Sequence, residues 1–176
     1  MRKLDYWKVI EHYKVKREAQ AMYGFWVDWH NKSKSSIIEH LLKNKRYQII
    51  SQLQYYLQYI LKETDYGKSC IYIEEFEKCL NSEITIWRGG SGKYIKDYNY
   101  YRTWTSFTAS KERLNAFSIY NGTYASRQWV LDENRHYWQV ELKLPLKNIL
   151  LYQDVMDAEV IVSIEDTRNS ILINKK

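Results

Sequence analysis

The spacing of apolar residues changes near Glu83, and this change limits what the chain can fold into. Before it, apolar residues recur every three or four positions, as they do along one face of a helix. After it, short runs rich in β-branched and aromatic residues are separated by turn residues, which is typical of strands. Helices followed by strands indicate an α+β fold, because βαβ units would alternate the two patterns. We therefore predict an α+β chain whose helices come first.

The helical part contains two long segments and one short one. The apolar face of the first is formed by Val15, Ala19, Met22, Trp26 and Trp29, and that of the second by Ile38, Leu42, Ile49, Leu53, Tyr56 and Ile60. Ser35 or Ser36 is placed to cap the second helix, and Asp65-Tyr66-Gly67 is placed to end it. A shorter helix is predicted over 73–80.

The strand-rich part contains six predicted strands and one helix. The strands are expected at 84–87, 101–107, 138–144, 149–152, 160–164 and 170–173. The helix follows Ser110 as its N-cap, with Leu114 and Phe117 facing inward. We predict a helical segment over 1–66 and a strand-rich core over 67–176, forming one compact domain together.

Composition and charge narrow the class of protein. The chain has 176 residues, of which 45% are hydrophobic, so it can bury a core and is not a disordered tail. It has no membrane-length apolar run and no signal-peptide stretch, which predicts a cytoplasmic protein without a membrane partner. Residues 1–66 hold 12 of the 27 basic residues but only 7 of the 21 acidic ones, a net charge of +5 within the total of +6. These basic helices are predicted to meet an acidic or nucleic-acid-associated partner.

Two familiar kinds of site are excluded. The run Gly89-Gly90-Ser91-Gly92-Lys93 lacks the spacing of a phosphate-binding P-loop, because Trp87 and Tyr94 occupy the required Gly and Ser/Thr positions. The four histidines have no metal-ligand spacing with one another or with Cys70 and Cys79, so no metal is predicted. Both cysteines are expected to be reduced.

Three short pieces, read in order, carry more information than any one of them. The first is Thr85-Ile86-Trp87-Arg88-Gly89, in which an arginine ends a strand before a glycine turn. The second is the hydroxyl-rich run Trp104-Thr105-Ser106-Phe107-Thr108. The third is Asp157-Ala158-Glu159-Val160-Ile161-Val162, two carboxylates leading into an apolar strand. This ordered set resembles the arginine–serine–glutamate class of mono-ADP-ribosyltransferases, which includes bacterial toxins and phage-encoded enzymes.

The resemblance implies a split β-sandwich that binds NAD as substrate and expels nicotinamide. It assigns Glu159 as the catalytic acid that stabilises the oxocarbenium-like ribose, with Ser106 holding Glu159 by a hydrogen bond. Arg88 would contact the dinucleotide and brace the site, and Gly89 would let the backbone approach the nicotinamide amide. Thr108 would support the strand, and Phe117 would stack on nicotinamide.

Two positions depart from the family pattern. Phe107 stands in the middle of a motif that is commonly Ser-Thr-Ser, and Asp157 stands where the family has Glu or Gln. A carboxylate at Asp157 favours arginine as the acceptor, because it can hold a guanidinium. If strand geometry extends back to Asp157, its side chain shares a face with Glu159. Two alternatives stay open: an NAD glycohydrolase of the same fold, and a basic nucleic-acid-binding module with its Lys, Arg and Tyr residues over 43–56.

Overall fold

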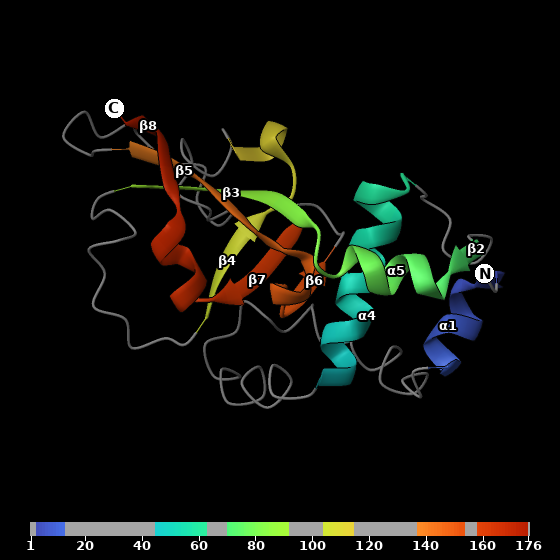
Figure 1. Ribbon diagram of the computed structural model, residues 1–176. Coiled ribbons are helices and arrows are strands. Elements are labelled where there is room, and N and C mark those ends of the chain that lie inside the picture. The colour runs from blue at the N-terminus through green and yellow to red at the C-terminus, as the bar shows by residue number, and fades with distance from the viewer. Residues whose placement is uncertain are drawn as a thin grey trace, which may run out of the picture. The chain divides into compact units, whose positions relative to one another are not determined.

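The computed structural model describes residues 3–12, 45–62, 70–91, 104–114, 137–153 and 158–175. The chain divides into two compact units (Figure 1), which are described separately. The first unit comprises Met1–Ser82 with Pro145–Gln153, and the second comprises Glu83–Leu144 with Asp154–Lys176.

The first unit is mainly helical. Its elements are β1 (Lys3–Asp5), α1 (Tyr6–His12), α4 (Lys45–Tyr55), a π-helical segment (Tyr56–Ile60), β2 (Cys70–Tyr72), α5 (Ile73–Cys79), a 3-10 turn (Leu146–Asn148) and β6 (Leu151–Gln153). Strands β1 and β2 pair antiparallel. The predicted short helix over 73–80 is confirmed as α5. The prediction that residues 1–66 are helical was wrong at Lys3–Asp5, which form strand β1. Three-residue strands are too short to show a period of two.

Helix α4 continues directly into the π-helical segment. The wider turn of that segment changes which of its side chains are buried. The amide of Leu61 donates to the carbonyl of Tyr56 at 2.9 Å, a bond that spans five residues. The wider turn rotates the following residues away from the predicted stripe. Leu53 and Tyr56 are buried as predicted, but Ile60 is 37% exposed. The predicted cap at Ser35 or Ser36 and the first helix lie outside the described residues.

Tyrosines form much of the core of the first unit. Tyr55 stacks on Tyr59 with 4.8 Å between ring centroids, and both rings meet Tyr152 edge-on. Burial, with Tyr59 close by, raises the pKa of the Tyr55 phenol. Burial also raises the pKa of Tyr56 to about 12, with smaller contributions from Cys79 and Glu75. These phenols stay neutral in the folded protein at physiological pH.

Polar side chains of α4 attach this helix to the segment that precedes β6. The side-chain amide of Gln52 donates to the carbonyls of Lys147 and Ile149 at 2.8 and 3.2 Å. The amide of Gln48 donates to the same Lys147 carbonyl at 2.9 Å. Residues almost a hundred positions apart in sequence are thus joined within the first unit.

The second unit is built on an antiparallel sheet. Its strands are β3 (Glu83–Ser91), β4 (Trp104–Thr108), β5 (Tyr137–Pro145), β7 (Glu159–Ser163) and β8 (Ile171–Lys175), with 3-10 turns at Lys111–Arg113 and Glu165–Asn169. Within this unit the strand order is β7-β4-β3-β5-β8. A bulge interrupts the β5–β8 register between Gln139 and Val140.

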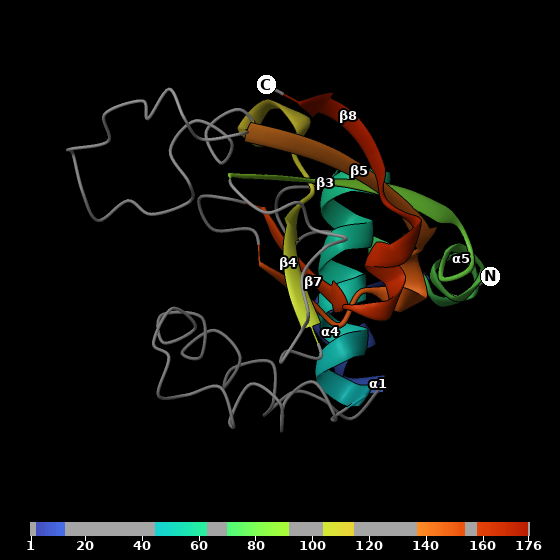
Figure 2. The same ribbon diagram turned by 90° about the vertical axis from the view of Figure 1, so that its left-hand side faces the viewer.

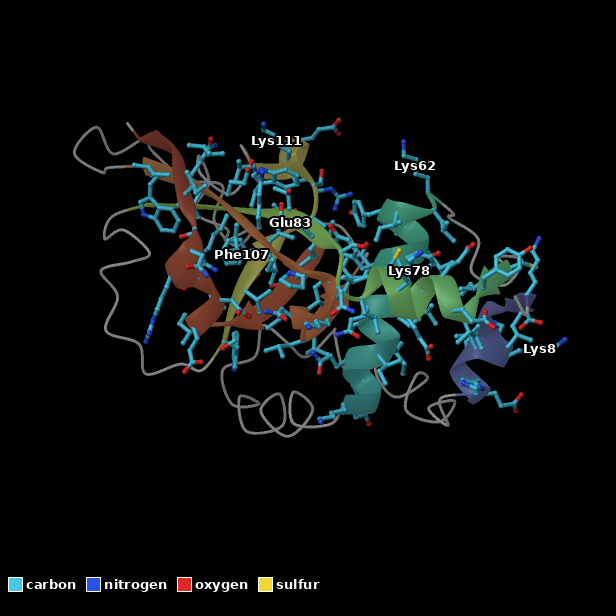
Figure 3. The ribbon with its side chains drawn as sticks, viewed as in Figure 1. Lys8, Lys62, Lys78, Glu83, Phe107 and Lys111 are labelled. Carbon is cyan, nitrogen blue, oxygen red and sulfur yellow. The ribbon has the colours of Figure 1, made fainter. Side chains whose placement is uncertain are left out.

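The six predicted strands correspond to β3 through β8, but β3 runs on to Ser91, four residues beyond its predicted end. Figure 2 shows β4 beside β7, and β5 between β3 and β8. One face of this sheet, called the core face below, carries the buried residues Phe107 of β4 and Val160 and Val162 of β7. On the other face Thr108 and Ile161 are buried as well. Phe107 lies among the packed side chains, whereas the exposed Lys111 reaches outward (Figure 3). The α+β class is therefore confirmed.

No helix in the described ranges combines the length and the apolar character that crossing a bilayer requires.

Candidate functional site

The pairing of β4 with β7 gathers the predicted hydroxyl and carboxylate residues on one face of the sheet. Thr108 stands directly opposite Glu159, and Ser106 stands opposite Ile161. Cross-strand partners share a face, and so do residues two apart in one strand. Ser106, Thr108 and Glu159 therefore project from the same face, with Ser106 and Glu159 as diagonal neighbours.

The hydroxyl of Ser106 donates a hydrogen bond to Oε1 of Glu159 at 2.5 Å. The two residues are 53 positions apart in sequence and come from adjacent strands. Both side chains are partly exposed, so the carboxylate is held in place yet remains in reach of solvent. The contact that the resemblance implied between these two residues is present, whereas their part in NAD chemistry stays a prediction.

Arg88 supports the same strand from the opposite face. Its Nη1 donates to Oγ1 of Thr105 at 3.0 Å and to the backbone carbonyl of Ser106 at 2.5 Å. Thr105 precedes Ser106 and points to the core face, where it is 7% exposed. The guanidinium thus fixes the backbone of the residue whose side chain holds Glu159. Bracing by Arg88 is observed, and its contact with a dinucleotide stays a prediction.

The residue before Glu159 has an unusual backbone conformation. Ala158 has φ 47°, in the left-handed region, and its side chain is 2% exposed. Its carbonyl accepts a hydrogen bond from the amide of Ala109 at 2.8 Å, which holds the bend in place. Non-glycine residues adopt this region at a cost of about 1 kcal/mol, and such residues gather at functional sites.

This bend corrects one expectation about the two carboxylates. Strand β7 begins at Glu159, and the left-handed Ala158 interrupts the extended geometry before it. Strand alternation therefore does not carry back to Asp157, and the argument that placed it on the face of Glu159 fails. Asp157 itself lies outside the described residues.

Gly90, which lies in β3 two residues after Arg88, has no room for a side chain. A Cβ atom built on Gly90 would lie 2.2 to 2.7 Å from three atoms of the Trp138 indole on β5. Trp138 is 3% exposed, so its ring cannot swing into solvent. The predicted end of the strand at Arg88, before a glycine turn, was wrong, because Gly89 and Gly90 continue strand β3 to Ser91 and Gly90 packs against Trp138.

Two functional candidates were missed by sequence reasoning. Trp87 is partly exposed and stands opposite Thr108, so it belongs to the face that carries Glu159. Its Nε1 donates to Oε2 of Glu141 on β5 at 3.0 Å. Strand alternation around Arg88 was the available signal for Trp87. Nothing in the sequence linked it to Glu141, 54 positions away.

The remaining predicted residues are only partly located. Ser110 occupies the N-cap position of the turn Lys111–Arg113 as predicted, but its side chain makes no cap hydrogen bond. The amide of Ser110 donates to the hydroxyl of Thr108 at 3.1 Å. Leu114 is buried as predicted. Phe117 lies outside the described residues.

The hydrogen-bonded pair of Ser106 and Glu159 suits two chemical roles. A carboxylate with a hydroxyl donor on one oxygen can stabilise a nearby cation or hold a substrate hydroxyl. In the described part of the chain, no group of three or more His, Cys, Asp or Glu residues is placed to hold a metal ion.

Comparison with protein-family models, with curated proteins and with solved structures finds no match for this chain.

Proposed function

We propose that this protein is a mono-ADP-ribosyltransferase, which transfers ADP-ribose from NAD to a macromolecular target and releases nicotinamide. The observation that carries the proposal is the hydrogen bond from Ser106 to Glu159, made between two strands and backed by Arg88. The family resemblance suggested these three residues from sequence, and hydrogen bonds link them across the three neighbouring strands β3, β4 and β7. That convergence would be a coincidence if each were an ordinary strand residue.

The proposed reaction breaks the bond between C1′ of the ribose and the nicotinamide nitrogen. The electron pair of that bond leaves with nicotinamide, and the ribose passes through an oxocarbenium-like state. The Glu159 carboxylate faces this developing positive charge and accepts a hydrogen bond from a ribose hydroxyl. The acceptor atom of the target then bonds to C1′ and loses its proton.

Ser106 and Arg88 act on Glu159 rather than on the ribose. The Ser106 hydroxyl occupies one carboxylate oxygen and thereby sets the direction of the other. Arg88 holds the Ser106 carbonyl, so the donor cannot drift. A carboxylate fixed in this way need not reorganise as charge develops, which is the main source of electrostatic catalysis.

Incubation with labelled NAD and a cell lysate tests the proposal. Wild-type protein should release nicotinamide and label a target that mass spectrometry identifies. Glu159→Gln keeps the side-chain size and removes the charge, so labelling should fall by about 10²- to 10³-fold. Glu165→Gln is the matched control, because Glu165 is an exposed glutamate in the turn after β7.

The outcome separates this proposal from its alternatives. Nicotinamide release without a labelled target indicates an NAD glycohydrolase. If wild type neither releases nicotinamide nor labels a target, the transferase proposal is wrong. Equal activity of Glu159→Gln and wild type would remove Glu159 from the reaction. A target labelled on arginine would support the acceptor that Asp157 favours.

A further inference from the structure

A short row of side chains crosses the neighbouring strands β3, β5 and β8. Trp87 on β3 donates its Nε1 hydrogen to Oε2 of Glu141 on β5 at 3.0 Å. Glu141 stands directly opposite Ile171 on β8, so these two side chains project from the same face of the sheet. The row therefore consists of an indole, a carboxylate and an aliphatic side chain, with the carboxylate in the middle.

This row is separate from the hydrogen-bonded pair of Ser106 and Glu159. In the strand pairing Thr108 stands between Trp87 and Glu159, and it is only 2% exposed. A buried residue thus separates the indole from the carboxylate of the candidate site. A group that binds at the row therefore has no need to take part in chemistry at Glu159.

The carboxylate of Glu141 has no counter-charge. Within the described ranges no basic side chain forms an ion pair with it. This includes Lys143, which is exposed and lies two residues further along β5 on the same face. Trp87 is a neutral donor and binds one oxygen only, so the negative charge of this partly buried group is not balanced. A cation supplied by another molecule would balance it.

The indole beside the carboxylate is held by its edge. The N–H bond of tryptophan lies in the plane of the ring, so the hydrogen bond to Glu141 leaves both faces of the ring unused. Trp87 is partly exposed, and in the described part of the chain no other ring and no cation packs on it. The face of tryptophan attracts cations more strongly than that of any other side chain. The indole and the carboxylate therefore favour the same kind of ligand.

Ile171 narrows the ligand to one kind of side chain. It is 59% exposed and lies on the other side of Glu141 from Trp87. Arginine combines an apolar stem with a planar charged head. With its stem on Ile171, its guanidinium can stack on the indole and donate to Oε1 of Glu141. The ammonium group of lysine is a point charge without a plane, so it cannot make both of these contacts.

We propose that Trp87, Glu141 and Ile171 form a binding site for an arginine side chain on the surface of a protein partner. The bound arginine is a docking residue and is not itself modified. The site needs neither NAD nor the transfer reaction, so it goes beyond the proposed function and does not depend on it.

Titration with acetyl-arginine methylamide tests the site directly. Binding is followed by the NMR signal of the Trp87 indole N–H, which is identified by its absence from the spectrum of Trp87→Phe. In wild type this signal should shift and reach saturation, with a dissociation constant in the millimolar range because a single side chain makes few contacts. Acetyl-citrulline methylamide has nearly the same shape without the charge. It should bind about 5- to 30-fold more weakly.

Variants of the row separate its contributions. Glu141→Gln can still accept the hydrogen bond from Trp87, so the indole stays in place while the charge is lost, and affinity for the arginine probe should fall about 2- to 5-fold. Ile171→Ser removes the apolar contact and should weaken the arginine and citrulline probes alike. Glu83→Gln is the matched control, because Glu83 is an exposed glutamate at the start of β3. It should keep the wild-type affinity.

Three results would overturn the inference. The first is a Trp87 signal that stays in place with the arginine probe or shifts equally with the citrulline probe. The second is equal binding of acetyl-lysine methylamide, which would show a site for any cation. The third is an unchanged affinity in Glu141→Gln. Because these titrations contain no NAD, each of these results leaves the proposed function to be judged by nicotinamide release alone.

Discussion

Replacing Gly90 by alanine should strongly destabilise the second unit. The added methyl carbon would lie 2.2, 2.6 and 2.7 Å from three carbons of the Trp138 ring. Non-bonded carbons prefer a separation of about 3.5–4.0 Å, so the ring or the strand must move by more than an ångström. Trp138 is 3% exposed, so its ring is enclosed by neighbouring atoms that would have to move with it.

The expected loss in the free energy of unfolding follows from the shift that the Trp138 ring or strand β3 must make. Overpacking a well-packed core typically costs about 1–3 kcal/mol, and this overlap places Gly90→Ala at the upper end. Because Arg88 lies two residues before Gly90, the shift should also loosen its contacts with β4. Activity should therefore fall even under conditions in which the variant remains folded.

Denaturant unfolding of four proteins measures this effect. They are wild type, Gly90→Ala, Trp138→Leu, and the double variant. Trp138→Leu removes the ring that the methyl group would strike, so Gly90→Ala should cost much less in that background. The coupling between the two substitutions should exceed about 1 kcal/mol. A free energy change for Gly90→Ala that is small, or is the same in both backgrounds, would refute the packing argument.

Three further predictions follow from residues described above. Arg88→Lys keeps the charge but loses the forked geometry, so calorimetry on the folded variant should show weaker NAD binding; unchanged affinity would contradict this. Asp157→Asn should reduce transfer to arginine while NAD hydrolysis persists, which parallel assays of nicotinamide release and target labelling can check. The unfolded tyrosine ionises near pH 10 and Tyr56 near 12, so stability present below pH 10 is lost as the pH rises towards 12. In Tyr56→Phe this loss should be smaller, as measured by unfolding at pH 9 and pH 11.5.

The strands could be predicted from sequence because each is dense in residues that favour a half-buried sheet. The run Glu159–Ser163 has three consecutive buried apolar residues, and Trp104–Thr108 places Thr105 and Phe107 on one face. Such local patterns need no knowledge of the partner strand. The π-helical segment could not be predicted, because a single wider turn leaves no period to detect.

The candidate site was predictable in its members and less so in its geometry. Ser106 and Glu159 were paired by resemblance, and their hydrogen bond is present. The placement of Arg88 on the opposite face depends on the register between β3 and β4, which sequence does not specify. The left-handed Ala158 was also unforeseen, because alanine does not favour that conformation.

Strand β4 makes contacts that matter for the site on both of its faces. Ser106 presents its hydroxyl on one face, while Arg88 and Thr105 secure it from the other. Anyone transplanting this constellation onto another sheet would have to carry both faces of the strand. A graft of Ser106 and Glu159 alone would omit Arg88 and Thr105. The serine that donates to the carboxylate would then lack the contacts that hold its backbone in place.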